Sequence, residues 1–134
     1  MRAIDFARAA LAETALVLAV ACGGTSGTPP SPTLTCSTLP NATTILIVNN
    51  AVCPQTLTVP PGSRVMFINN DTRAHDMFSD PHPEHTNCVE INQVGHLEAG
   101  QQRETGNLNT VDSCGFHDHM QDQVRALQGT IVIR

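Results

Sequence analysis

Short β-branched runs separated by turn residues are the feature that most limits the fold of this chain. Apolar segments of four or five residues recur from residue 44 to the C-terminus, and Asn, Pro and Gly residues close them. Helical periodicity is weak, and only residues 118–127 have a pattern that fits a helical turn. Such spacing favours an all-β sandwich over residues 36–134. We expect strands at residues 44–48, 56–59, 64–68, 93–97, 102–106, 110–114 and 129–134.

One long segment, residues 72–90, has no clear strand pattern. It nevertheless holds three of the six histidines, together with one cysteine and one methionine. Long loops in compact domains commonly carry function. We therefore expect this segment to contribute to a binding site.

The N-terminal residues have the pattern of an export signal. Arg2 and Arg8 precede a short apolar run at residues 14–21, which is too short to span a bilayer. Residues 1–21 are therefore read as a signal peptide, and Cys22 follows small residues as a lipidated cysteine does. An ordinary secretory peptide is the alternative. Residues 22–35 then form the lipid-attachment cysteine and a flexible Gly/Ser/Thr/Pro linker. We expect an exported chain in the bacterial periplasm or at the cell surface, held to a membrane by its anchor.

Charge excludes one class of partner. The formal net charge is -5 and the chain has no lysine. Nucleic-acid binding requires basic groups that neutralise phosphates, so nucleic acid is not an expected partner.

The densest chemistry lies at residues 114–120, which read CGFHDHM. Cys114, His117 and Met120 have Cys-x-x-His-x-x-Met spacing, and His75 follows an earlier strand-like run. Two imidazoles and a thiolate with a weak thioether form the blue-copper arrangement, because soft sulfur ligands suit Cu(I) and imidazole suits both oxidation states.

These motifs resemble the cupredoxins. The run PPGSRVMF at residues 60–67 is similar to the stretch before the family's first histidine ligand, and GTIVI at residues 129–133 is similar to its final strand. The resemblance implies a Greek-key β-sandwich and a monomer that carries single electrons. Its copper would be type 1, and its partner a redox protein of the cell envelope. The ligands implied are His75, Cys114, His117 and Met120.

Cysteine pairing leaves alternatives open. If Cys22 is lipidated, four cysteines remain in an exported chain, where two disulfides are the default. Cys36–Cys53 is the preferred bridge because both residues flank the first strand. A Cys88–Cys114 bridge is the alternative that would remove the thiolate from a blue-copper site.

Additional metal ligands are available near the motif. They are His82, His85, Cys88 and His119. The plain alternative is that His82 and His85 are solvated on a rigid exposed loop. Three functions thus remain: an electron carrier, a copper-binding or delivery protein without a redox partner, and a metal-free disulfide-bonded interaction domain. An enzyme is not expected, because no ordered acid–base pair or nucleophile motif occurs.

Overall fold

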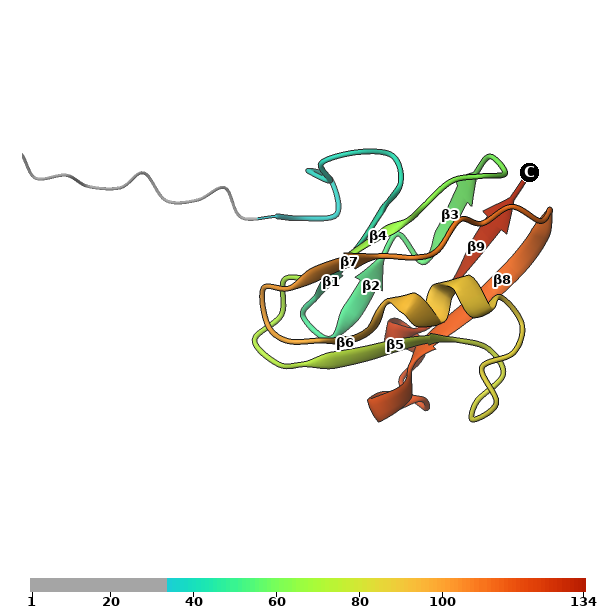
Figure 1. The fold of residues 1–134 in the computed structure, drawn as a ribbon. Coiled ribbons are helices and arrows are strands. Elements are labelled where there is room, and N and C mark those ends of the chain that lie inside the picture. Colours follow the sequence, from blue (N-terminus) through green and yellow to red (C-terminus); the bar gives the residue numbers. More distant parts are fainter. Residues whose placement is uncertain (1–33) are drawn as a thin grey trace, which may run out of the picture. The chain divides into compact units, whose positions relative to one another are not determined.

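The computed structural model describes residues 34–134, which form two facing β-sheets (Figure 1). One sheet has the strand order β2-β1-β4-β7, and the other has the order β3-β9-β8-β5-β6. The strands are β1 (Thr44–Val48), β2 (Ala51–Cys53), β3 (Thr56–Val59), β4 (Met66–Asn69), β5 (His75–Ser79), β6 (Gly95–Leu97), β7 (Gln102–Glu104), β8 (Asp112–Asp118) and β9 (Gly129–Ile133). The all-β sandwich expected from the sequence is confirmed.

The core lies between the sheets and consists mainly of branched aliphatic side chains. Phe67 of β4 and Phe116 of β8 meet edge to face across it, with ring centroids 5.2 Å apart. The pairing joins strands that are distant in sequence, since β1 runs parallel to β4 and β3 runs parallel to β9. Burial of alternate side chains on the two inner faces accounts for the short period-two runs in the sequence.

Two of the nine strands have the bounds expected from the sequence, namely β1 and β3. Strand β2 was missed. It pairs with β1 across a two-residue turn in which Asn49 and Asn50 both have positive φ angles, 53° and 58°. Asparagine tolerates this conformation, and such a turn joins antiparallel strands directly. The two asparagines therefore start a hairpin and do not simply end a strand.

The expectation that residues 72–90 contain no strand was wrong. This segment contains β5, which lies between β8 and β6, and the start of the 3-10 helix η1 (Val89–Gln93). The inward-facing positions of β5 are His75, Met77 and Ser79, so polar residues hide its period-two pattern. Residues 118–127 contain two short 3-10 helices, η2 (His119–Gln121) and η3 (Arg125–Leu127).

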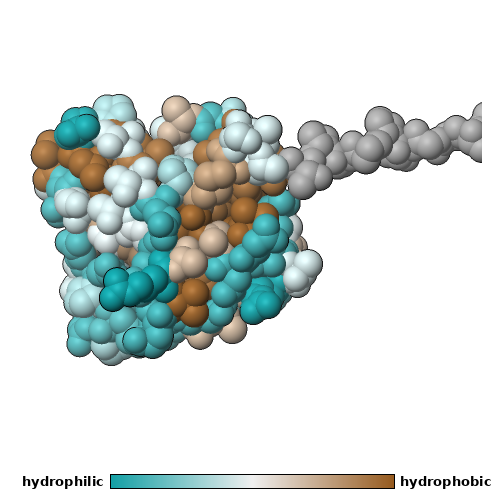
Figure 2. All heavy atoms as spheres, turned by 180° about the vertical axis from the view of Figure 1, so that it is seen from behind, coloured by the Kyte–Doolittle hydropathy of each residue, from teal (hydrophilic) through white to brown (hydrophobic). Residues whose placement is uncertain are grey.

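The proposed signal peptide, Cys22 and nearly all of the linker lie outside the described residues. Within residues 34–134, no helix is long and apolar enough to cross a membrane. Figure 2 shows apolar residues set among hydrophilic ones on the rear face. Among the described residues, the large apolar side chains that are exposed are Val89, Val111 and Met120.

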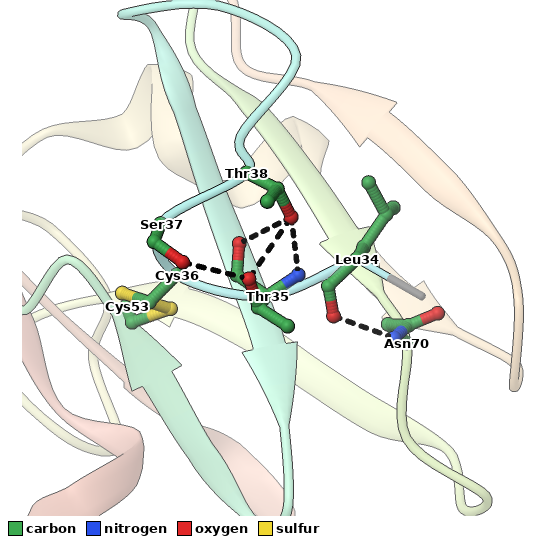
Figure 3. The surroundings of a disulfide bond; sticks show 7 residues. All are labelled: Leu34, Thr35, Cys36, Ser37, Thr38, Cys53 and Asn70. Atoms are coloured by element: carbon green, nitrogen blue, oxygen red, sulfur yellow. Dashed lines mark hydrogen bonds between the residues drawn. A yellow bond between two sulfur atoms is a disulfide. The ribbon is translucent and has the colours of Figure 1, made fainter. Parts of the chain in front are cut away.

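A disulfide joins Cys36 to Cys53 at the end of β2 (Figure 3). Hydrogen bonds among Thr35, Ser37 and Thr38 order the segment next to this bridge. The bridge thereby holds the start of the described chain against the four-stranded sheet. The pairing is the one preferred from the sequence.

Candidate metal centre

Strand β8 carries the cysteine–histidine motif, and its side chains alternate between two faces. Cys114 and Phe116 point into the core and are fully buried. Gly115 and His117 lie on the opposite face, because successive residues of a strand project to opposite sides. The Cys-x-x-His spacing is therefore held in extended β-structure, where it separates the two side chains.

The expected cysteine ligand is not a thiolate in this structure. Cys114 forms a disulfide with Cys88, and the two Cα atoms are 5.7 Å apart. A sulfur in a disulfide carries no negative charge for a copper ion to bind. The pairing that the sequence offered only as an alternative is the one that the structure contains.

The expected ligand His75 is also occupied. It is fully buried between the sheets, with Nδ1 2.7 Å from Oδ2 of Asp118 and Nε2 3.3 Å from Oδ2 of Asp71. Both ring nitrogens thus face carboxylates and not the other predicted ligands. Asp118 and Cys114 are four residues apart on β8, so they lie about 13 Å from each other along the strand. His75, which contacts Asp118, is therefore far from Cys114.

Met120, the expected axial ligand, lies on η2 and is 60% exposed. Its backbone N–H donates to Oδ1 of Asp118. The predicted set His75, Cys114, His117 and Met120 is therefore not assembled in this structure. The predicted ligands lie on opposite faces of the five-stranded sheet, because His75 and Cys114 face the core while His117 faces outward.

His117 instead belongs to a cluster of four histidines. The ligating atoms of this four-histidine cluster all lie within 4.8 Å of one another; its members are His82, His85, His117 and His119. Nδ1 of His82 is 3.4 Å from Nε2 of His117, and Nδ1 of His119 is 3.1 Å from Nε2 of His85. Nitrogens bound tetrahedrally at about 2.0–2.1 Å from a metal are about 3.3 Å apart. These spacings fit one metal ion.

The outer face of the five-stranded sheet supports the cluster. Phe78 of β5 points outward and stacks on the ring of His85, with centroids 4.6 Å apart and planes inclined by 21°. The same phenyl ring meets His119 edge on at 5.8 Å. Strand β5 pairs with β8 so that Phe78 lies opposite His117. The Phe78 side chain thus packs against histidines from two segments, His85 and His119.

The loop that carries His82 and His85 is fastened at both ends. The backbone N–H of Asp80 donates to the carbonyl of Gly115 on β8, and that of Asn87 donates to the carbonyl of Asp80. The Cys88–Cys114 disulfide follows directly after this loop. The amide of Asn92 also donates to the carbonyl of His85. This loop is therefore held over β8 with its imidazoles next to His117.

Asp80 fixes the orientation of His117. Its Oδ1 is 2.7 Å from Nδ1 of His117, which leaves Nε2 facing the other histidines. Gly115 makes this contact possible, because a Cβ at that position would collide with the Asp80 carboxylate. A carboxylate on the second ring nitrogen is the usual support for a metal-binding histidine, since it sets the tautomer and the ring plane.

Electrostatics favour the neutral imidazole at His85. Partial burial lowers the pKa of His85, and the neighbouring His117, His119 and His82 lower it further, while Asp76 opposes them. The neutral form is the one that can bind a metal. On the outer side, Nε2 of His82 lies 3.9 Å from Oδ2 of Asp122. The pKa of that carboxyl is lowered mainly by a hydrogen bond from Gln123, and also by His82.

Sequence reasoning named all four histidines without grouping them. His82 and His85 have His-x-x-His spacing, and His117 and His119 have His-x-His spacing, which is the signal that was available. Their meeting depends on the pairing of β5 with β8, and β5 had not been recognised. Cys88, proposed as an additional ligand, is instead bonded to Cys114.

No protein-family model matches the chain, and no curated protein matches it. Solved structures do match. A purple cupredoxin from Nitrosopumilus maritimus is 17% identical, with 68% of this chain and 98% of that chain covered and a TM-score of 0.53. Oxidised plastocyanin from Dryopteris crassirhizoma is 15% identical, with 68% and 99% covered and a TM-score of 0.55.

Amicyanin from Paracoccus versutus is 13% identical, with 75% of this chain and 90% of that chain covered and a TM-score of 0.55. At identities this low, the similarity supports the fold alone, and the site residues are assessed from their geometry in this chain. The fold expected from the sequence motifs is the one found: this chain has the cupredoxin fold.

Proposed function

We propose that this protein binds one copper ion at the four-histidine cluster and serves to hold or deliver that ion. The observation that carries the proposal is the convergence of four ring nitrogens within 4.8 Å, two from the loop after β5, one from the end of β8 and one from η2. The Asp80–His117 contact supports it, because it supplies the orienting carboxylate that metal-binding histidines commonly have.

Copper is the favoured metal for two reasons. A site of nitrogen donors binds Cu(II) more tightly than the other divalent first-row ions. The fold is also that of purple cupredoxin, plastocyanin and amicyanin, and two of the matching amicyanin structures are of Cu(I) forms. Binding is proposed in preference to catalysis, because the proposed site uses all four histidines as ligands and the Asp80 carboxylate serves to orient His117.

The proposed place of action is outside the cytoplasm. The signal-like residues 1–21 support export, and Cys22 followed by the linker supports attachment to a membrane through a lipid. Two disulfides in residues 34–134 agree with an oxidising compartment. A monomer would then extend from the membrane on its linker.

Electron transfer is the second candidate, and the fold shared with plastocyanin and amicyanin favours it. A redox partner in the cell envelope would then exchange single electrons with copper at the histidine cluster. Voltammetry of the copper-loaded protein distinguishes the candidates. A reversible one-electron wave supports the carrier, whereas slow, irreversible exchange supports holding or delivery.

A copper titration of the purified, oxidised protein tests the main proposal. We expect one tightly bound Cu(II) per chain in competition with a chelator. The variant His85→Gln should lose this binding, and His96→Gln should retain it because His96 is an exposed residue that contacts Glu98 outside the cluster. Equal copper binding by both variants would contradict the assignment.

A further inference from the structure

A second group of metal-binding residues lies on the other side of β8. The sulfur atoms of Cys88 and Cys114 and a carboxylate oxygen of Asp112 lie within 4.8 Å of one another. In the oxidised chain the two sulfurs are joined, so this group cannot bind a metal. Opening the bridge would create two thiols and a carboxylate in the same place.

A cavity of about 190 Å³ adjoins this group and gives it room for an ion. Cys88 and Asp112 both line it, with Glu90 and Asn109 among the other lining residues. The cysteines themselves are nearly inaccessible, with Cys114 0% and Cys88 6% exposed. An ion would therefore reach the sulfurs through this cavity, past the exposed carboxylate of Asp112.

The surrounding fold keeps the two cysteines close without the bridge. Cys114 sits within β8, which pairs with β9 on one side and β5 on the other. Cys88 precedes η1, whose Ile91 is fully buried and whose first turn begins with a hydrogen bond from the Ile91 N–H to the Cys88 carbonyl. With Cα atoms 5.7 Å apart, small side-chain rotations bring both sulfurs to one ion at about 2.3 Å.

From these contacts we propose that Cys88, Cys114 and Asp112 form a redox-gated site for Cu(I), closed in the oxidised chain and open after reduction. Thiolates select soft ions such as Cu(I), and the conditions that reduce the bridge also keep copper in that state. Asp112 supplies a weaker oxygen ligand at the entrance. This site does not depend on the four-histidine cluster, because His117 points to the opposite face of β8.

The gating step is a thiol–disulfide exchange. A small-molecule dithiol of the same compartment, which reaches the sulfur of Cys88 through the cavity, transfers two electrons and two protons to the Cys88–Cys114 bridge and becomes a disulfide itself. The S–S bond breaks and two thiols form. Binding of one Cu(I) then releases up to two protons as the thiols become thiolates.

Cu(I) stoichiometry before and after reduction tests the proposal. The full-length chain is reduced with a trialkylphosphine, which uses one water, becomes a phosphine oxide and adds no thiols of its own. Cu(I) is then titrated against a chromogenic chelator. We expect the reduced chain to bind one more Cu(I) than the oxidised chain, with a rise in ultraviolet thiolate-to-copper absorption. Asp112→Asn should weaken the added site about tenfold.

Two controls separate this site from others. The double variant Cys88→Ser/Cys114→Ser should gain no Cu(I) on reduction, although its Cys36–Cys53 bridge still opens. The variant His117→Gln should gain one, even if its cluster binds nothing. The proposal is overturned if reduction adds no Cu(I), if the gain persists in the double variant, or if NMR shows that the reduced wild type has lost its folded amide dispersion.

Discussion

Two histidine environments in this molecule show what makes a histidine available to a metal. His75 is fully buried between the sheets, and both of its ring nitrogens contact carboxylates, those of Asp118 and Asp71. In the four-histidine cluster the imidazoles face one another, and carboxylates lie on nitrogens that point away: Asp80 is 2.7 Å from Nδ1 of His117, and Asp122 is 3.9 Å from Nε2 of His82. The partners of the second nitrogen, and not burial or motif spacing, distinguish a structural histidine from a candidate ligand.

The largest expected effect is the loss of copper binding when His117 is changed. His117→Gln removes the most buried ligand of the cluster, and we expect the copper Kd to rise by at least about 100-fold. Chelator competition measures this. The matched variant His75→Gln should leave the Kd within about twofold of wild type, although it lowers stability. A similar loss of affinity in both variants would remove the distinction between the two environments.

The buried pair should show the opposite behaviour. Asp118→Ala leaves His75 without its closest partner in a fully buried position. We expect the free energy of unfolding to fall by about 2 kcal/mol, because a fully buried imidazole nitrogen loses its hydrogen-bond partner. Urea denaturation of the metal-free protein measures it. Under conditions in which the variant is folded, its copper affinity should equal that of the wild type. A tenfold loss of affinity would instead link Asp118 to the metal site.

Changing the residues that orient His117 should reduce copper affinity less than changing His117 itself. Asp80→Asn replaces one carboxylate oxygen with an NH2 group and removes the negative charge, and Gly115→Ala places a methyl group where the Asp80 carboxylate lies. We expect each to weaken copper binding by about 10- to 100-fold. Glu84→Gln is the matched control, because it removes one charge from the same loop without touching the cluster. If it weakens binding as much as Asp80→Asn, the effect is general electrostatics and not orientation.

The smallest expected effect is a pH dependence of stability near the buried pair. Burial acts to raise the pKa of Asp71, but hydrogen bonds from the backbone N–H groups of Thr72 and Asn50, together with His75, lower it below the ordinary value of 3.8. The ionised carboxylate therefore stabilises the fold above pH 3.8, and this contribution is lost as the pH falls through the lower folded-state pKa. Acid titration of stability in wild type and Asp71→Asn measures it. If the stability of the two proteins changed with pH in the same way, the lowered pKa of Asp71 would be contradicted.

The fold could be predicted further than the site. Strands β1 and β3 follow from β-branched runs closed by turn residues, and the motifs around residues 60–67 and 129–133 indicated the correct sandwich. Strand β5 could not be recognised, because its inward positions include a histidine and a serine whose burial depends on tertiary partners. Ser79, for example, is buried and bonded to Asn92. Once β5 is absent from the prediction, nothing brings His82 and His85 to His117.

The ligand prediction was wrong because it relied on the spacing of the Cys-x-x-His-x-x-Met motif. Cys-x-x-His-x-x-Met spacing gives adjacent ligands only where the chain turns, and here β8 continues as a strand from Asp112 to Asp118. Extended geometry sends Cys114 and His117 to opposite faces, and Cys88 is placed to bond with Cys114. The spacing of a motif therefore identifies a metal site only when the backbone conformation of that segment is also known.

The absorption and EPR spectra of the Cu(II)-loaded, oxidised protein test the central claim most directly. Copper held by four imidazoles should give a weak visible absorption and an EPR signal split by several equivalent nitrogens, and both should be unchanged in Cys88→Ser/Cys114→Ser. An intense thiolate-to-copper absorption band that disappears in that double variant would contradict the account. It would return Cys114 to the copper site.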